Sequence, residues 1–171
     1  MRNLEIKCRA DDLESVRRRA LSAGGRSVEV LRQTDTYYRV VRGMLKLREI
    51  EGHPAELIAY SRPDASGSRV SDYRVYTTAD VESLRDVLQR THDALGAVRK
   101  VRELILMERT RVHLDTVDGL GTFVELETAG TDRPDEEVEA EHVRVMSALG
   151  LRAAEGITTG YAALLGIATP D

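Results

Sequence analysis

A chain of 171 residues, 42% of them hydrophobic and 32% charged, is long enough to bury a core and too apolar to remain disordered. It contains no run near the roughly 20 apolar residues of a membrane span, and its net charge of −4 argues against a protein that coats nucleic acid. We therefore expect one soluble, cytoplasmic domain over residues 1–171, a monomer or homodimer with neither a membrane nor a nucleic-acid partner.

The chain begins with a strand pattern that leads into a helix. Residues 2–9 alternate strictly between apolar and polar side chains, which is the period of a β-strand. Asp11 follows, with Glu14 at the spacing of a capping box, and apolar residues at helical intervals continue to the glycine pair at 24–25. These signals predict a first strand and then a helix capped by Asp11.

Strands dominate the rest of the chain. Periodicity and turn residues predict strands at about 27–41, 43–51, 55–62, 71–78, 97–109, 110–117 and 122–129, and helices at about 80–91, 135–149 and 158–166. Because the strands come in runs rather than alternating with helices, we expect an antiparallel sheet in an α+β fold.

Nearly every predicted strand has one apolar face and one charged face, since residues two apart point the same way. The charged faces carry the basic residues Lys7, Arg9, Lys46, Arg48, Arg62, Arg74, Lys100, Arg102 and Arg111 and the acidic residues Glu5, Asp115, Glu125 and Glu127. One interpretation is an ordinary sheet whose polar face meets water. The other is a sheet that curls until the charged faces line a tunnel, which requires a ligand or internal partners to compensate them.

A metal-bound polyphosphate is the ligand that would compensate both the basic and the acidic set of charges. Arginine supplies forked donors to phosphate oxygens and lysine supplies compact point charges. Carboxylates are the ligands that Mg²⁺ and Mn²⁺ prefer. A polyanion alone would explain only the basic set, and the chain has no exposed basic run and no tryptophan to suggest nucleic acid.

At these residues the chain resembles the CYTH superfamily of class IV adenylate cyclases and thiamine triphosphatases, the triphosphate tunnel metalloenzymes. N-L-E-I-K (3–7) is similar to the E-x-E-x-K signature of that family. The segments that follow it in the family's order are Q-T-D-T-Y-Y (33–38), G-M-L-K-L-R-E (43–49), L-I-A-Y-S-R-P (57–63), K-V-R (100–102), R-V-H-L-D (111–115), G-L-G-T-F-V-E-L-E (119–127) and G-Y-A-A-L-L-G (160–166). The resemblance extends over essentially the whole chain.

The resemblance implies an eight-stranded antiparallel β-barrel with flanking helices, and it assigns roles to residues. Together with the charged faces it yields three groups of candidates: catalytic Lys7, Lys100 and Arg111; substrate-binding Lys46, Arg48, Arg62, Arg74, Arg102 and Tyr161; and metal-binding Glu5, Asp115, Glu125 and Glu127, which would hold Mg²⁺ or Mn²⁺. Two positions depart from the family pattern. Asn3 replaces the first glutamate of the signature, which predicts a weaker or single metal site, and Gly160 stands where relatives often carry serine.

Two chemistries fit such a tunnel, and a third possibility is binding without chemistry. The main expectation is metal-dependent hydrolysis of inorganic triphosphate, thiamine triphosphate or ATP. The alternative is a class IV adenylate cyclase that converts ATP to cyclic AMP and pyrophosphate. The third is a non-catalytic module that binds polyphosphate or nucleotide, an option that the missing first carboxylate keeps open. His113 lies on the charged face, where it is expected to be a hydrogen-bonded structural residue or to touch a phosphate.

Overall fold

The structure, a computed structural model, describes residues 3–61, 69–70 and 72–167. Its strands are β1 Asn3–Arg9, β2 Arg26–Tyr38, β3 Met44–Ile50, β4 Ala55–Ser61, β5 Arg69–Val70, β6 Asp72–Thr78, β7 Ala94–Met107, β8 Thr110–Val117 and β9 Gly121–Ala129. Its helices are α1 Leu13–Ser22, α2 Val81–Thr91, α3 Asp135–Leu149 and α4 Tyr161–Leu164, with a 3-10 turn, η1, at Ala153–Glu155.

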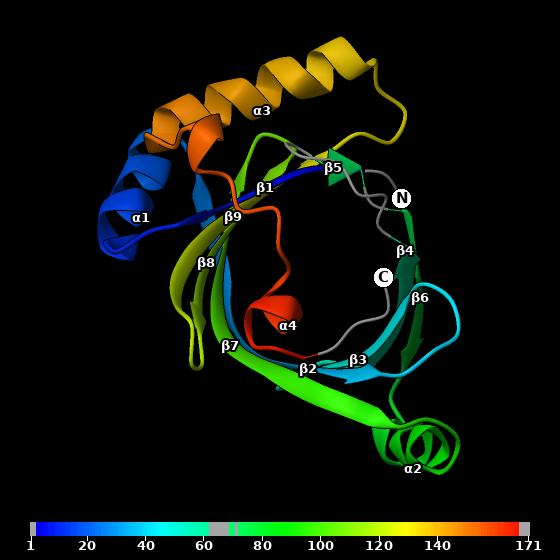
Figure 1. Cartoon of the computed structure of the whole chain (residues 1–171). Helices are drawn as coiled ribbons and strands as arrows, with labels where there is room; N and C mark the ends of the chain where they lie inside the picture. The colour runs from blue at the N-terminus through cyan, green and yellow to red at the C-terminus, as the bar shows by residue number, and fades with distance from the viewer. Residues whose placement is uncertain (1–2, 62–68, 71, 168–171) are drawn as a thin grey trace.

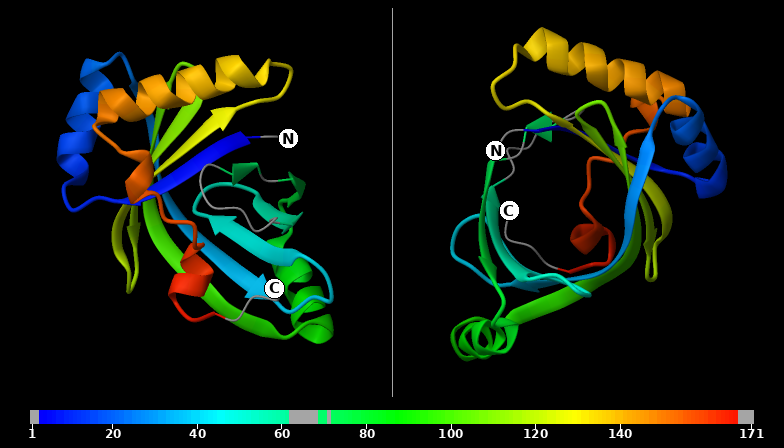
Figure 2. Two further views of the ribbon diagram at one scale, coloured as in Figure 1. Left: turned by 45° about the horizontal axis from the view of Figure 1, so that its top comes forward. Right: turned by 180° about the vertical axis from the view of Figure 1, so that it is seen from behind.

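The strands form one antiparallel sheet that curls on itself. Across the described residues the strand order is β5-β1-β9-β8-β7-β2-β3-β4-β6. β5 and β6 are the two ends of this order, yet only one residue separates them in the chain. A sheet whose end strands are consecutive in sequence has to bend until its edges meet, and Figures 1 and 2 show the strands wrapped around a common interior.

This arrangement confirms the predicted α+β barrel. β5 and β6 together take the place of the single strand predicted at 71–78, so the nine strands seen in the described part of the chain correspond to the eight expected. Gly43, where a tight turn was predicted, links β2 to β3 with a φ of 66°, a conformation that glycine adopts without strain.

Helices cover the apolar outer faces of the strands, as their alternation predicts. α1 and α3 pack on β1, β8 and β9 (Figure 1), and the apolar core residues of these strands recur at every second position. The core there consists of Ile6, Cys8, Val16, Ala20, Ile105, Met107, Val112, Leu114, Val124, Leu126, Val145, Met146 and Leu149. α2 covers a smaller cluster, in which Leu88 packs with Tyr38 and Leu47.

The last helix lies inside the curled sheet rather than on it (Figures 1 and 2). Tyr161 and Ala162 of α4 pack against inward-facing Tyr37, Val98 and Phe123. The interior of the barrel therefore has an apolar part, filled by α4, beside the part that carries charges.

The helix ends agree with the predictions except at α1 and at α4, which covers only Tyr161–Leu164 of the predicted residues 158–166. α3 spans the predicted residues 135–149. The cap of α1 is Asp12, not Asp11 as predicted, because the Asp12 carboxylate accepts a hydrogen bond from the backbone N–H of Ser15 at 2.8 Å. None of the helices in the described part of the chain combines the length and hydropathy needed to cross a bilayer.

Candidate functional site

Charged side chains from β1, β2, β3, β7, β8 and β9 meet in the interior of the curled sheet. They alternate with the apolar residues that form the outer core, so the same period-2 pattern builds both faces. Lys7, Lys100 and Arg102 are each at most 8% exposed. Charges buried to this degree need compensating partners, and the interior supplies them as a set of ion pairs.

Asp115 on β8 is the centre of the most enclosed group, which we call the Asp115 cluster: Asp115, Lys100, Arg102 and Tyr161. Arg102 lies directly opposite Asp115 across β7 and β8 and donates from Nε to Oδ1 and from Nη2 to Oδ2, both at 2.6 Å. Lys100 Nζ lies 3.4 Å from Oδ2, and the Tyr161 hydroxyl donates to Oδ2 at 2.9 Å. Burial would raise the pKa of Asp115, but Arg102 and Lys100 outweigh it and lower the pKa to about 2.

Asp35 on β2 holds a second group, the Asp35 cluster: Asp35, Gln33, Lys46 and Arg48. Lys46 Nζ donates to Oδ2 at 2.8 Å, Arg48 Nε donates to Oδ1 at 2.9 Å, and Gln33 Nε2 donates to Oδ1 at 3.0 Å. Burial opposes ionisation of Asp35, yet Lys46 and Arg48 hold its pKa far below the usual range. The predicted phosphate ligands Lys46 and Arg48 are therefore fixed side by side.

The two interior lysines of these clusters, Lys46 and Lys100, have pKa values well below the usual range. Burial and the neighbouring Arg48 charge lower the pKa of Lys46 to about 7, although Asp35 acts in the opposite direction. Burial and Arg102 lower the pKa of Lys100 to about 8, against the effect of Asp115. Both amines would regain full charge beside an additional anion.

A third group, the acidic group, consists of His113, Glu125 and Glu127, whose ligand atoms all lie within 4.8 Å of one another. Glu125 is 3.2 Å from Lys7 Nζ and accepts from Arg102 Nη2 at 2.7 Å. Glu127 accepts from Arg111 Nη2 at 2.6 Å. Burial and Arg102 lower the pKa of His113, which favours the neutral imidazole.

The acidic group fits a divalent cation. Two carboxylates supply the hard oxygens that Mg²⁺ and Mn²⁺ prefer, and His113 Nδ1 is buried with no hydrogen-bond partner among the described residues. Glu5 lies directly opposite Glu127 in the β1–β9 register, which places it at the edge of the group. Asn3, at the position of the first signature glutamate, is buried on the same face of β1.

Tyr161 joins the interior to α4. Its ring faces Lys7 Nζ at 4.1 Å and Lys100 Nζ at 5.0 Å, and it meets Phe123 edge-on with centroids 5.0 Å apart. The two lysine contacts have cation–π geometry. Tyr161, predicted to bind substrate, thus contacts Lys7 and Lys100, two of the predicted catalytic residues.

One predicted substrate-binding residue in the described part of the chain, Arg74, is not brought to these clusters. Tyr60 faces the interior, 5.7 Å from Lys46 Nζ, and Tyr73 is its direct partner across β4 and β6. Arg74 is the next residue, so it points to the outer face, where its side chain is exposed and donates to the Tyr73 carbonyl. Arg62 lies outside the described residues.

Sequence reasoning missed Asp35 and did not assign His113 to a ligand group. Asp35 shares a face with Gln33 and Tyr37, so alternation along β2 could have placed it inside. Its role depends on the register that sets it opposite Arg48, which the strand pattern does not specify. His113 is directly opposite Glu125 in the same way.

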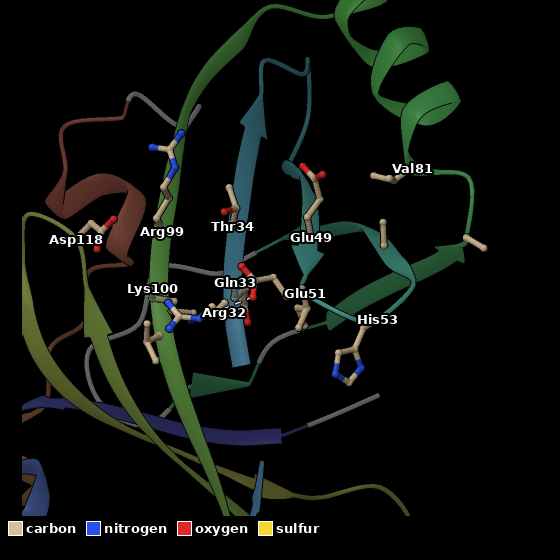
Figure 3. Close-up of a pocket in the computed structure, with 14 residues that line it drawn as sticks. Arg32, Gln33, Thr34, Glu49, Glu51, His53, Val81, Arg99, Lys100 and Asp118 are labelled. Carbon is tan, nitrogen blue, oxygen red and sulfur yellow. Dashed lines mark ion pairs between the residues drawn. The ribbon is translucent and has the colours of Figure 1, made fainter. Parts of the chain in front are cut away.

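A separate pocket lies on the outer face of β2, β3 and β7, near the start of α2 (Figure 3). Thr34 and Arg99, directly paired across β2 and β7, lie on this face because Gln33 and Asp35 occupy the other. Charges of both signs line it, including Arg32 and Glu51, 3.8 Å apart. It offers no cation cluster comparable to the interior one.

The sequence and the fold both have relatives. A family model, the CYTH domain, matches residues 1–161. A protein of Methanocaldococcus jannaschii that is named as a candidate adenylate cyclase is 25% identical over 177 residues, covering 98% of this chain and all of its own.

Solved structures share the architecture. A Pyrococcus horikoshii protein superposes with a TM-score of 0.84 at 20% identity, covering 95% of this chain and 98% of that one. A Hippeastrum protein, described as a candidate adenylyl cyclase with a dominant triphosphatase activity, superposes with a TM-score of 0.65 at 18% identity, covering 98% of each chain. The family match over nearly the whole length, the barrel and the charged interior agree, and the chain belongs to the CYTH domain family.

Proposed function

We propose that the protein hydrolyses a triphosphate inside its barrel with the help of Mg²⁺ or Mn²⁺. The observation that carries the proposal is the meeting of buried lysines and arginines with the paired carboxylates Glu125 and Glu127 in one interior. Inorganic polyphosphate alone would leave the carboxylates unexplained, and a metal alone would leave the cations unexplained. A metal-bound triphosphate matches both.

The clusters suggest how the chain's own residues would act. Lys46, Arg48 and Arg102 would bind phosphate oxygens, with Asp35 and Asp115 holding their side chains in place. Lys7, Lys100 and Arg111 would neutralise the charge that spreads over the phosphate oxygens as the terminal P–O bond breaks. Glu5, Glu125 and Glu127 would hold the metal, and a bound divalent ion supplies Lewis-acid polarisation of the phosphate.

In this proposal Asp115 positions cations rather than ligating the metal. Its two oxygens already accept hydrogen bonds from Arg102 and Tyr161, and it is not among the three residues whose ligand atoms lie together. Tyr161 acts through Asp115 in the same way.

Cyclisation of ATP is the second candidate, because the Methanocaldococcus jannaschii relative is named for it. It requires a nucleoside held so that its 3′-oxygen reaches the α-phosphorus. Phe123 packs edge-on against Tyr161 of α4. Arg9 lies over the Phe123 ring and Lys7 over the Tyr161 ring, so both rings already have partners where a base would stack. Hydrolysis needs only the phosphate contacts and the metal, and the Hippeastrum protein of the same fold is described by its triphosphatase activity.

The experiment is to incubate the purified protein with Mg²⁺ or Mn²⁺ and inorganic triphosphate, thiamine triphosphate or ATP. We expect metal-dependent release of inorganic phosphate. Formation of cyclic AMP and pyrophosphate from ATP would replace the proposal with the cyclase. Tight binding of all three compounds without any product would make the protein a binding module.

Replacing Arg48 with alanine should weaken binding of inorganic triphosphate roughly 10- to 150-fold, the equivalent of about 1.5–3 kcal/mol for charge-assisted hydrogen bonds. The fold should survive, because Lys46 still compensates Asp35. Isothermal titration calorimetry measures the loss. Arg32→Ala, an exposed arginine on the outer face of β2, is the matched control; equal affinities for the two variants would remove Arg48 from the site.

A further inference from the structure

His113 is a buried residue, and within the part of the chain that the structure describes its ring atom Nδ1 lacks the hydrogen bond that a buried polar atom normally makes. It lies on β8, faces the interior and is 5% exposed. Its Nδ1 has no hydrogen-bond partner among the described residues. An unsatisfied buried polar group costs about 1–3 kcal/mol, so this nitrogen is expected to meet a ligand in the working protein.

The surroundings of Nδ1 point to the kind of ligand. It lies 3.8 Å from Glu125 Oε2 and 3.7 Å from Glu127 Oε1. These separations exceed the 2.7–3.2 Å of a hydrogen bond. Ligand bonds of about 2.1 Å put two ligands of one ion about 3.0 Å apart at a right angle and about 4.2 Å apart when opposite, and both distances lie between those limits.

The backbone holds this arrangement. His113 is the direct partner of Glu125, and Arg111 the direct partner of Glu127, in the β8–β9 pair. The three side chains of the acidic group therefore share one face of a regular two-strand ladder. The hydrogen bonds from Arg111 Nε and Nη2 both end on Glu127 Oε2, which leaves Oε1 turned towards His113.

A phosphate contact explains His113 less well. The oxygens that face Nδ1 belong to two carboxylates, and the nearby Arg102 is already held by Glu125 and Asp115. A phosphate oxygen at Nδ1 would be repelled by both carboxylates unless a cation lay between them. A cation satisfies the imidazole and both carboxylates together.

We propose that His113 Nδ1, Glu125 and Glu127 ligate one divalent ion directly, and that the imidazole makes the site selective for a first-row transition ion such as Mn²⁺ or Co²⁺ over Mg²⁺. The proposal deepens the proposed function and rests on it for the use of a divalent ion. Mg²⁺ favours all-oxygen ligand sets, whereas imidazole suits transition ions and affinity rises from Mn²⁺ to Co²⁺. The nitrogen also offsets the carboxylate lost at Asn3, since it adds a ligand without adding charge.

Metal binding itself tests the proposal, without any turnover. The metal-free full-length protein is titrated with Co²⁺ and with Mg²⁺ in a calorimeter, as wild type, His113→Gln and the control His53→Gln, a half-exposed histidine in a turn. We expect His113→Gln to weaken Co²⁺ binding by about 10- to 100-fold, the loss seen even for outer partners of metal ligands, and to weaken Mg²⁺ binding much less. The control should bind both ions as the wild type does. Equal losses for the two ions, or none, would overturn the inference.

A spectroscopic measurement on the wild type guards against a variant that fails to fold. Pulsed electron paramagnetic resonance of protein-bound Mn²⁺ should show coupling to a directly coordinated nitrogen. The chain has four histidines, and the coupling should disappear in His113→Gln and persist in His53→Gln. Bound Mn²⁺ with no nitrogen coupling in the wild type, or no Mn²⁺ binding at all, would refute the proposal.

The metal-site proposal and the proposed hydrolase activity can fail independently of each other. Phosphate release from inorganic triphosphate without nitrogen coupling would leave the hydrolase and remove His113 from the metal. Nitrogen coupling without any product would leave the metal site and remove the hydrolase.

Discussion

Replacing Asp115 with alanine is expected to lower the free energy of unfolding by about 3–5 kcal/mol, the usual cost of breaking a buried ion pair by removing one partner. Arg102 and Lys100 would stay buried without the carboxylate that now accepts from both. Tyr161 would also lose its acceptor. Because Glu125 still pairs with Arg102 at 2.7 Å, we expect the lower half of that range. Urea unfolding followed by circular dichroism measures the change.

The matched control for this variant is Asp118→Ala, an exposed aspartate just beyond the end of β8. A surface substitution of this kind should change the free energy of unfolding by no more than about 0.5 kcal/mol. If Asp115→Ala proved as stable as Asp118→Ala, the Asp115 cluster would not hold the interior together, and the positioning role given to Asp115 would fall.

Without metal, the affinity for inorganic triphosphate should fall as pH rises above neutrality, approaching tenfold per pH unit for one required proton. The pKa of Lys46 is about 7 in the unliganded protein, so its amine is largely neutral at pH 8. A bound anion restores its charge, and binding therefore takes up a proton. Calorimetry in buffers of different ionisation enthalpy counts that proton, and Lys46→Arg, which keeps its charge, should flatten the pH dependence. An identical pH slope in Lys46→Arg would exclude Lys46 as its source.

Stability of the unliganded protein should respond to pH in the opposite sense. The folded pKa of Lys46 is depressed from 10.5 to about 7. Between these values the unfolded chain binds more protons than the folded one, so the contribution of Lys46 makes the free energy of unfolding rise with pH. Comparing the unfolding curves of wild type and Lys46→Arg across this window isolates the contribution.

Much of the fold could be predicted from the sequence because side chains alternate between the two faces of a strand and follow a 3.6-residue period in a helix. Burying one face therefore leaves the same period in the apolar residues of the sequence. β8 and α3 begin and end where their patterns do. The errors arise where neighbouring residues offer the same chemistry. Asp11 and Asp12 can both cap a helix, and only the hydrogen bond to Ser15 decides between them. The small strand β5 carries too few residues to show a period.

The site was predictable only as far as alternation within one strand reaches. Lys100 and Arg102 are two residues apart, so their shared face follows from the sequence. The position of Arg74 does not, because β6 has a tyrosine on each face, Tyr73 on one and Tyr76 on the other, and the pairing of Tyr73 with Tyr60 sets which face turns inward. The partners of Asp35 and Asp115 depend on cross-strand register, which is a property of the assembled sheet.

The carboxylates of the interior have one consequence for ligand binding. Glu125 and Glu127 now hold Lys7, Arg102 and Arg111, the same cations that a phosphate chain would attract. An anion arriving alone would strip these carboxylates of their counter-charges, and a metal arriving alone would leave the cations facing one another. Each ligand thus removes the penalty of the other, so the two should bind with positive cooperativity, and by thermodynamic reciprocity metal should tighten triphosphate by the factor that triphosphate tightens metal.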